Sequence, residues 1–484
     1  MNLRVVEYIL GKLSLAAGAA LLLPFCLALF YIESSRFAFA ASIVVCVLLG
    51  VLLTNLGRLE SEQLSVREGI AITGVGWIMV TLLGMLPYAV GGYLPVLDGI
   101  LECISGLSGT GATVIDSIET MPRSLLLWRS LTHWFGGLGI IVIFIALLPQ
   151  FGRGAVYMYN AESTGPTSER VLPRIKETAM ALFGIYLLFT AAATIVYMFC
   201  GMDFLTALNH SFSTIATGGF STYDTSVAHF NSPVTEGCIT FFMLISSANF
   251  GMYVMAWRRG WHVIWENQEF RTYLGIVLLV TLLVGANLVW EMGLEPGEAL
   301  RESLFQAASL SSTTGFVSAD FDTWPSFSKF FLLLLMFLGG CAGSTAGGLK
   351  VSRLILLVKM VYSIIWQKLH PRMLSHVTLE GAEIGEEVLY GVGRFFFVYL
   401  MLSVLWTLLL IGDGVAPLDA LGVSVSTMGS VGPGFGMAGP TCTYSALPDF
   451  SKGVVCISML LGRLETFTVL ALLSPAFWRR SKGW

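Results

Sequence analysis

The sequence predicts an all-α integral membrane protein in which four pseudo-symmetric repeats surround a central pore. Each repeat consists of a span, a pore helix and a second span, and two extra transmembrane helices precede the first repeat. Three observations lead to this prediction: the bulk composition, a series of long apolar runs, and four loops that share one plan.

Composition indicates that lipid, not water, surrounds most of the chain. Hydrophobic residues make up 55% of the 484 residues and charged residues only 12%, and the mean hydropathy is +0.77. Soluble globular chains carry about 25% charged residues, so much of the usual water-facing surface is missing. The net charge of −4 argues against a nucleic-acid partner.

The eight cysteines do not form a recognisable pattern. None stands at C-x-x-C spacing, which favours small apolar packing residues over a metal site or a disulfide framework. Cys200 falls in an apolar stretch. For Cys238 and Cys442, which we expect outside the bilayer, the sequence offers no pairing.

Ten apolar runs reach the length of about 20 residues that a helix needs to cross the hydrocarbon core. They lie at 13–32, 37–56, 70–91, 125–149, 178–200, 236–256, 272–291, 328–349, 394–412 and 453–473. The first is too long for a signal-peptide core and is interpreted as a retained span. Arg and Lys concentrate in alternate loops, and Asp and Glu in the others, which predicts a multi-pass protein with both termini cytoplasmic.

The runs divide the chain into five segments. These are an N-terminal two-span extension at 1–69, pore repeat 1 at 70–149, pore repeat 2 with a preceding cytosolic loop at 150–256, pore repeat 3 at 257–363 and pore repeat 4 at 364–484.

Four outer loops repeat one plan, in which a Pro or Asp opens a short apolar stretch that ends in a Thr/Ser/Gly cluster. They cover 95–113, 203–221, 296–317 and 417–435. Irregular backbone is tolerated at membrane depth only where it is buried in protein or lines a water-filled cavity. Glycine permits backbone angles that turn carbonyls toward one axis, and four such loops would replace the hydration shell of an ion. Ordinary turns and small-residue helix packing are the alternatives.

Several segments carry a resemblance to a known family. They are Arg129–Gly139 (RSLTHWFGGLG), Ala216–Ser221 (ATGGFS), Gly339–Lys350 (GGCAGSTAGGLK) and Leu461–Glu465 (LGRLE). With these, the whole chain resembles the Trk/Ktr/HKT superfamily of potassium transporters, and most closely the TrkH family, the membrane subunits of bacterial Trk systems.

This resemblance implies a K⁺ filter with one glycine per loop. The matching glycines are Gly111, Gly219, Gly315 and Gly432, and the residues before them, whose carbonyls would bind the ion, are Thr110, Gly218, Thr314 and Val431. Gly434 is an alternative to Gly432. Glycine at position 111 favours K⁺, and a Na⁺-selective or Na⁺-coupled relative of the same architecture is the second interpretation.

Two features of the sequence are candidates for a gate. Arg463 stands near the middle of the last predicted span, where an arginine costs at least about 2.5 kcal/mol, so it should face a cavity, backbone carbonyls or a carboxylate such as Glu465. The glycine-rich segment 339–348 cannot form a sturdy helix. The resemblance implies that it is an intramembrane gating loop, with Gly343, Ser344, Thr345 and Gly347 as gate residues. A helix-packing seam is the alternative, and a phosphate loop is disfavoured because Val351 follows Lys350.

The resemblance also implies the cellular setting. It indicates K⁺ uptake across the bacterial inner membrane, a homodimer, no enzyme activity, no organic cofactor, and control by a cytosolic nucleotide-binding ring like TrkA. Basic inner segments at 150–177, 257–271 and 359–390 are candidate docking surfaces. His133 lies in a family segment without an assigned role, and the residues leave open whether transport is channel-like or coupled to H⁺.

Overall fold

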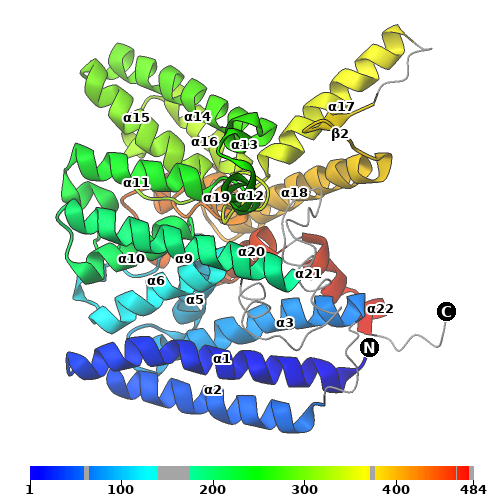
Figure 1. Ribbon diagram of the computed structural model, residues 1–484. Coiled ribbons are helices and arrows are strands. Elements are labelled where there is room, and N and C mark those ends of the chain that lie inside the picture. The colour runs from blue at the N-terminus through cyan, green and yellow to red at the C-terminus, as the bar shows by residue number, and fades with distance from the viewer. Residues whose placement is uncertain (59–64, 140–174, 371–375, 465, 479–484) are drawn as a thin grey trace.

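The computed structural model describes residues 1–58, 65–139, 175–370, 376–464 and 466–478. The regular secondary structure of the described residues is helical, apart from a two-stranded antiparallel hairpin of β1 (Thr378–Leu379) and β2 (Ala382–Glu383). Most helices run roughly along one direction, which Figure 1 shows from the side. The predicted all-α architecture is therefore observed.

The two N-terminal helices form a pair at one edge of the molecule. α1 (Leu3–Phe30) and α2 (Arg36–Leu56) lie side by side along most of their length, and α3 (Val66–Gly84) lies next to α1 (Figure 1). Close approach of the pair depends on Gly11, where a Cβ atom would lie 2.7 Å from the backbone nitrogen of Thr54. The Ser14 hydroxyl donates to the Cys46 carbonyl across the contact at 2.8 Å.

Four helical units follow, and each contains a long helix, a short half-helix and a second helix. Unit 1 has α3 (Val66–Gly84) with α4 (Leu86–Val90), α5 (Val96–Ser108) and α6 (Arg123–Leu138). Unit 2 has α9 (Ile175–Phe199), α10 (Phe204–Ile215) and α11 (Pro233–Ser246). Unit 3 has α14 (Gln268–Asn287), continued by a π-helical turn (Leu288–Met292), α15 (Pro296–Ser311) and α16 (Ser326–Leu338). Unit 4 has α18 (Glu386–Gly412), α19 (Pro417–Gly429) and α20 (Asp449–Arg463).

The units are arranged as a closed ring. The second helix of each unit packs against the half-helix of the next: α6 on α10, α11 on α15, α16 on α19, and α20 back on α5. Short 3₁₀ turns connect the half-helices to these second helices (Ile118–Thr120, Ser226–Phe230, Phe321–Thr323, Gly436–Ala438 and Tyr444–Ala446). We call the side of the molecule on which the half-helices begin the outer side.

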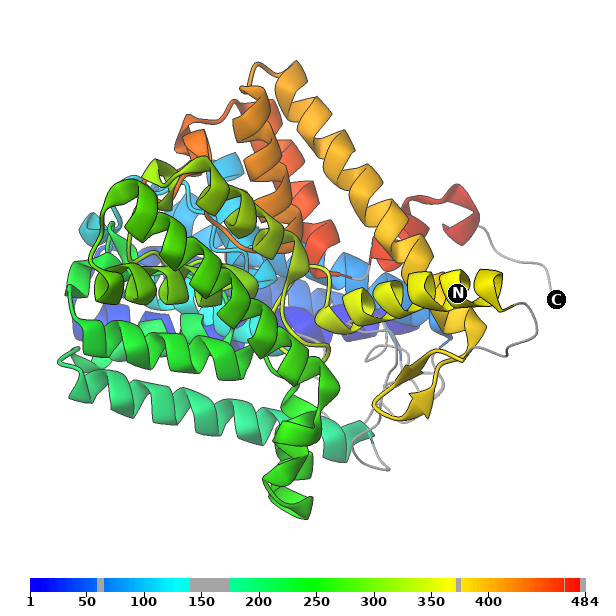
Figure 2. The same cartoon turned by 90° about the horizontal axis from the view of Figure 1, so that it is seen from above.

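Further helices lie toward the other, inner side. They are α12 (Phe250–Arg259), α13 (His262–Glu266), α17 (Val351–Leu369), α21 (Thr466–Leu473) and α22 (Pro475–Trp478). α17 projects away from the helical body, and the β hairpin, which connects α17 to α18 along the chain, lies beside these helices (Figures 1 and 2).

Six helices in the described ranges are long and apolar enough to cross a membrane: α1, α2, the α3–α4 stretch, α9, α14 with its π-helical turn, and α18. A seventh candidate is the pair α11 and α12, which is bent by 86° at residues 247–249. The prediction of an unbroken span at 236–256 is therefore wrong. Asn249 starts the new helix, because its side chain accepts the Gly251 amide at 2.8 Å.

The last two apolar runs are also interrupted. The predicted run 328–349 ends at Leu338, and residues 339–350, which we call the crossing segment, contain no helix. The predicted span 453–473 is wrong as one helix, because α20 ends at Arg463 and Leu464 is extended at φ −80° and ψ 148°. Part of the predicted span 125–149, from 140 onward, lies outside the described residues, as does most of the cytosolic loop that we expected after it.

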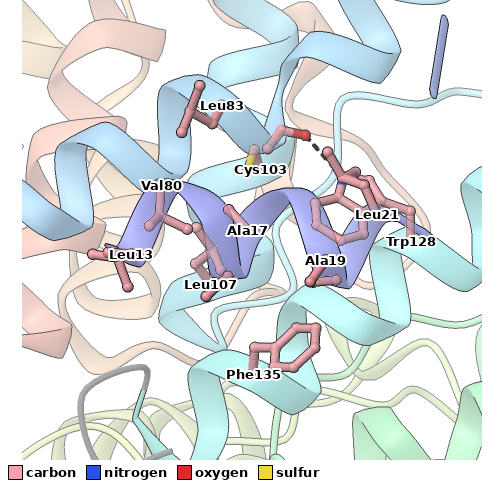
Figure 3. Close-up of a pocket in the computed structure, with 13 residues that line it drawn as sticks. Leu13, Ala17, Ala19, Leu21, Val80, Leu83, Cys103, Leu107, Trp128 and Phe135 are labelled. Atoms are coloured by element: carbon pink, nitrogen blue, oxygen red, sulfur yellow. Dashed lines mark hydrogen bonds between the residues drawn. The ribbon is translucent and has the colours of Figure 1, made fainter. Parts of the chain in front are cut away.

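An apolar cavity of about 290 Å³ separates α1 from unit 1. Figure 3 shows Ala17 and Ala19 of α1 on one side, with Leu107 of α5 and Phe135 of α6 close by. The Trp128 indole donates to the Gly84 carbonyl at 2.8 Å beside it.

Candidate functional site

Each half-helix ends in a loop with the same backbone conformation. We call these loops 1 to 4, at residues 109–113, 216–221, 312–317 and 430–435. In every loop one residue is left-handed and a glycine with positive φ stands two residues later. The left-handed residues are Gly109, Thr217, Thr313 and Ser430, and the glycines are Gly111 (φ 81°), Gly219 (84°), Gly315 (79°) and Gly432 (99°).

A backbone hydrogen bond to a serine carbonyl of the half-helix holds each loop in this conformation. The amide before the glycine donates to the serine carbonyl five residues earlier, at 2.8–2.9 Å. The pairs are Thr110 to Ser105, Gly218 to Ser213, Thr314 to Ser309, and Val431 to Ser426. Our sequence reasoning missed these serines, although a Ser six residues before each glycine is a visible fourfold signal.

The four glycines form a closed ring with backbone carbonyls. A Cβ atom added to any of them would collide with the carbonyl oxygen before the glycine of the next loop. The distances would be 2.2 Å from position 111 to Gly218, 2.0 Å from 219 to Thr314, 1.9 Å from 315 to Val431, and 2.4 Å from 432 to Thr110. All eight predicted filter residues therefore meet around one axis.

The fourth loop contains two glycines, and only one matches the other loops. Gly432 has a positive φ and faces the Thr110 carbonyl, whereas a Cβ atom at Gly434 would face Gly422 at 3.2 Å. Gly432 is thus the geometric equivalent of Gly111, Gly219 and Gly315.

A cavity of about 140 Å³ lies against all four glycines and is also lined by outer-side residues, among them Asp116 and Asp224. The hydroxyls of Ser445 and Thr443 donate to Asp116 and hold the pKa of its carboxyl below the ordinary 3.8. Asp116 is therefore ionised at neutral pH, and negative charge at the mouth of a cavity raises the local concentration of cations.

A buried ion pair supports loop 1. Arg129 donates through Nε to Glu102 at 2.6 Å, and both side chains are almost fully buried. Glu102 also accepts the Val114 amide at 3.0 Å, while Arg129 donates to the Ser221 carbonyl at 3.1 Å. The pair therefore connects α5 and α6 to loops 1 and 2.

His133, which had no predicted role, connects unit 1 to loop 2. Its Nδ1 lies 2.7 Å from the Gly106 carbonyl, and its Nε2 accepts the Phe220 amide at 3.2 Å. A carbonyl can only accept and an amide can only donate, so the ring carries its proton on Nδ1. His133 is fully buried and acts as a brace between two backbones.

The crossing segment lies directly against the inner ends of loops 2, 3 and 4. Thr345 donates to the Ile215 carbonyl at 3.0 Å, and the Gly347 amide donates to the Thr313 hydroxyl at 2.8 Å. A Cβ atom at Gly347 would lie 2.6 Å from the Gly429 carbonyl, so only glycine fits there.

The other predicted gate residues hold the crossing segment in shape. The Gly343 carbonyl accepts the Phe250 amide at 3.0 Å, which ties the segment to the bend between α11 and α12. The Ser344 hydroxyl donates to the Cys341 carbonyl at 2.6 Å within the segment.

Arg463 of α20 also contacts the crossing segment. Its guanidinium donates to the Thr345 carbonyl at 2.9 Å and to the carbonyls of Gly136 and Gly137 at 2.5 and 2.7 Å. It is the last residue of α20, which ends within the predicted span 453–473. The alternative partner, Glu465, lies outside the described residues.

Two further charged residues, which our sequence reasoning did not assign, hold the crossing segment. Glu269 Oε1 accepts the amides of Ala342 and Ser352, each at 2.8 Å, and Lys350 Nζ donates to the Ala346 carbonyl. All three contacts involve buried groups. In the sequence, Glu269 stands at the start of an apolar span, and a carboxylate at such a position could have indicated a structural role.

The described residues contain no group of three or more His, Cys, Asp or Glu side chains that could hold a metal ion. The oxygens gathered at the centre of the ring are instead backbone carbonyls, with threonine and serine hydroxyls behind them. Such a site suits an alkali cation, which is a hard ion that prefers oxygen ligands.

The ring and its loops define the class of this protein. It is an all-α integral membrane protein built from four repeated span–half-helix–span units, with backbone rather than reactive side chains at its axis. Comparison with known proteins identifies the family.

A sequence model of the TrkH family, described as a cation transport protein, matches residues 35–480. The Trk system potassium uptake protein TrkH of Salmonella typhimurium is 36% identical over 99% of this chain and all of the relative. The potassium uptake protein TrkG of Escherichia coli is 33% identical over 99% of both chains. The crystal structure of the potassium transporter TrkH from Vibrio parahaemolyticus matches with a TM-score of 0.89 and 35% identity, covering 99% of this chain and all of that one.

The chain therefore belongs to the TrkH family, which is a family of cation transporters and not of enzymes. The family resemblance and the all-α membrane fold predicted from the sequence are confirmed.

Proposed function

We propose that this protein takes up K⁺ across the bacterial inner membrane through a pore in which loops 1 to 4 form the ion filter. The observation that carries the proposal is the closed ring, in which each filter glycine touches the carbonyl of the next loop. Relatives over the full length are named as potassium uptake proteins, which supports K⁺ as the cargo.

The chemistry follows from the backbone. The C-terminal end of each half-helix carries a partial negative charge from the helix dipole, and the four ends converge at the ring. Carbonyl oxygens of Thr110, Gly218, Thr314 and Val431 would take the place of water around the dehydrated ion. No formal charge sits in the ring itself, so an ion can both enter and leave.

The crossing segment and Arg463 form the gate of this proposal. Thr345 is the central residue, because it contacts the end of α10 through its hydroxyl and Arg463 through its carbonyl. Arg463 places a positive charge on the inner side of the ring, which opposes the passage of a cation. The contacts of Gly343, Ser344 and Gly347 support a closed state of the segment.

Selectivity for Na⁺ is the second candidate. The two ions use the same kind of oxygen ligand, and the family architecture fits either. Glycine at position 111 favours K⁺ on the strength of the family resemblance, and competition between the ions tests this.

The decisive experiment measures uptake of ⁸⁶Rb⁺ by vesicles that contain the protein. We expect K⁺ to compete with the tracer far better than Na⁺. In the variants Gly219→Ser and Gly315→Ser the new Cβ atom would lie within about 2 Å of a carbonyl, so the ring must open and the preference for K⁺ should fall at least tenfold, about 1.4 kcal/mol.

The matched control is Gly184→Ala, because Gly184 lies in α9 where an added Cβ atom meets nothing within 4 Å. This variant should transport like the parent protein. Equal competition by Na⁺ and K⁺ in the parent protein contradicts the K⁺ filter and favours the second candidate. Absence of flux in every vesicle preparation contradicts both.

The proposal also includes the partners with which this protein assembles. We propose a homodimer controlled by a cytosolic nucleotide-binding ring like TrkA, which binds the inner side. The docking surfaces we expect include 257–271, which contains α13, and 359–390, which contains part of α17 and the β hairpin; most of 150–177 lies outside the described residues. Charge reversal at Arg258 and Arg259, both exposed, should weaken co-purification with the ring and leave dimerisation intact.

A further inference from the structure

The apolar cavity beside α1 lies outside the ring of loops, and none of the residues that line it belongs to loops 1 to 4. Its volume is about 290 Å³, and we call it the α1 cavity. On the α1 side the lining includes four alanines, Ala16, Ala17, Ala19 and Ala20, and larger apolar side chains of α3, α5 and α6 line the rest (Figure 3).

Close contacts between helices keep the α1 cavity open. A Cβ atom at Gly84 of α3 would lie 2.6 Å from the Cys103 sulfur of α5, and a Cβ atom at Gly76 would lie 2.9 Å from a methyl group of Leu13 in α1. α3 therefore already touches both neighbours beside the cavity and cannot move inward to fill it. If the cavity were empty, the side chains that line it would lose dispersion contacts on that side.

Water is unsuited to this cavity. The lining side chains are apolar, apart from the Cys103 thiol and the Trp128 indole, and the indole N–H already donates to the Gly84 carbonyl at 2.8 Å. A buried water needs about two to four polar partners, and an apolar cavity of about 150 Å³ stays dry and binds benzene. The α1 cavity is larger and therefore suits a longer apolar ligand.

The cavity opens at the depth of the hydrocarbon core. Ala16 and Ala19 are exposed, whereas the lining residues Leu21 and Leu107 are buried. The two exposed alanines stand near the middle of α1 (Leu3–Phe30), and only 33% of the most apolar stretch of this helix is buried. Because a transmembrane helix of this kind is surrounded by lipid, the molecules that meet the opening are phospholipids.

We propose that the α1 cavity is a binding site for one acyl chain of a membrane phospholipid, which enters between α1 and unit 1. The chain would bind by filling the space with methylene groups, and it needs no hydrogen bond from the protein. The flexible chain can follow the irregular walls, which the fixed helices cannot close.

An acyl chain in this position would support the pore helix of unit 1 from behind. Leu107 of α5 lines the cavity, and a Cβ atom at Gly136 of α6 would collide with the Leu107 carbonyl, so α5 and α6 touch there. The Gly136 carbonyl also accepts a hydrogen bond from Arg463 at 2.5 Å. The bound chain would therefore stabilise the contact of α5, α6 and α20 next to loop 1.

Photo-cross-linking of the full chain in vesicles tests this inference. The probe is a phosphatidylglycerol with a diazirine in the middle of one acyl chain, diluted into phosphatidylethanolamine, and mass spectrometry locates the adducts. Cys103 and Leu107 are buried and can react only with a chain inside the cavity, whereas the exposed Leu22 and Leu23 report on the surrounding lipid. We expect adducts at both places in the parent protein. In Ala17→Phe, whose ring fills the cavity, the α5 adducts should fall at least about tenfold, while those at Leu22 and Leu23 stay.

The matched control is Ala191→Phe, because Ala191 is an exposed alanine of the apolar helix α9 that does not line the cavity. This variant should give the same adducts as the parent. Labelling of Leu22 and Leu23 without any adduct on α5 in the parent overturns the inference, and so do α5 adducts that persist in Ala17→Phe.

Thermal unfolding in detergent gives a second measurement. Added phosphatidylglycerol should raise the midpoint of the parent and of Ala191→Phe by at least about 2 °C more than that of Ala17→Phe, because a ligand that binds only the folded state stabilises it. An equal rise in all three proteins contradicts the site. If Ala17→Phe does not fold, the adducts of the parent alone decide. The inference does not rest on the proposed ion pathway, so ion flux and acyl-chain binding can fail independently.

Discussion

At the scale of single residues, backbone conformation decides what each loop position accepts. The left-handed position tolerates threonine or serine in three loops, at Thr217, Thr313 and Ser430. The position two residues later is glycine in all four, because a side chain there would occupy the space of the neighbouring carbonyl. Steric exclusion between loops, and not the angle alone, therefore accounts for the four glycines.

Tyr444 is a further residue that shapes the ring. Its hydroxyl donates to the Gly432 carbonyl at 2.7 Å, and its amide donates to the Thr113 carbonyl at 2.8 Å. Ser426 donates to the same Gly432 oxygen at 2.8 Å. Loop 4 is therefore held against loop 1 by Tyr444, at the seam where the ring of units closes.

We predict that Tyr444→Phe keeps the fold but lowers the preference for K⁺ over Na⁺ by about fivefold. The lost hydrogen bond is worth about 1 kcal/mol, and the Gly432 carbonyl keeps only its bond from Ser426. Ion competition in the Rb⁺ uptake assay measures the change.

Tyr399→Phe is the control for this prediction. Tyr399 is equally buried, and its hydroxyl has no hydrogen-bond partner among the described residues, so its removal should leave the ion preference unchanged. An equal loss of preference in both variants would show that general packing, and not the bond to Gly432, is responsible.

At the scale of elements, interruptions of apolar helices create the region below the ring. α11, α16 and α20 all stop before they could cross a membrane, and the chain then turns or becomes irregular. The segments that follow bring the Thr345 carbonyl, the Arg463 guanidinium and the Asn249 side chain together beneath the loops. Buried polar groups are tolerated there because the polar groups at one interruption form hydrogen bonds with those at another.

Glu269 connects the crossing segment, through the Ala342 amide, to the first turn of α17, through the Ser352 amide. We predict that Glu269→Ala increases basal Rb⁺ uptake at least tenfold, because the part-buried amide of Ala342 and the buried amide of Ser352 lose their acceptor. Each unpaired amide costs about 1–3 kcal/mol, and 1.4 kcal/mol already shifts a closed–open equilibrium tenfold.

Glu269→Gln is the matched variant for this test. Both amides bind the same oxygen, Oε1, and the glutamine side chain retains one such acceptor, so uptake should stay within about threefold of the parent. The variant Arg463→Ala removes the contact with the Thr345 carbonyl, so its basal Rb⁺ uptake shows the value expected when the crossing segment is released. If Glu269→Ala folds and its uptake equals that of the parent, the carboxylate does not hold the gate.

At the scale of the whole molecule, four units complete one ring and the N-terminal pair stands beside it. The pair is attached to unit 1 through Glu33, in the turn between α1 and α2, which accepts the Arg123 amide at 2.9 Å and the Ser124 amide at 3.2 Å. These are the first amides of α6, where a carboxylate also interacts favourably with the helix dipole. The pair therefore supports the ring without contributing to its centre.

We predict that Glu33→Ala destabilises the protein by about 1 kcal/mol, the usual cost of losing a helix cap, and leaves the K⁺ to Na⁺ preference unchanged. Thermal unfolding in detergent should show a lower midpoint, by about 1–2 °C for a chain of this size.

Glu119→Ala serves as the comparison, because Glu119 is an exposed carboxylate in the loop before α6. It should leave the midpoint unchanged. A change of ion preference in Glu33→Ala would mean that the N-terminal pair takes part in shaping the ring.

From the amino-acid order alone one can recognise that lipid surrounds most of this protein, that its loops follow one plan four times, which family it resembles and which glycines stand in its loops. These are local or periodic properties: apolar length, alternating charge and a repeated Thr/Ser/Gly cluster are visible along the chain. Gly432 and Gly434 could not be separated in this way, since both stand in the same cluster.

Which segments meet becomes visible only in the folded molecule. The bend at Asn249, the end of α20 at Arg463 and the acceptors of Arg463 on α6 all depend on residues distant in sequence. An apolar run is equally compatible with one long helix or two short ones. The choice depends on whether neighbouring units supply hydrogen-bond partners for the interrupted backbone, and that information exists only when the ring is closed.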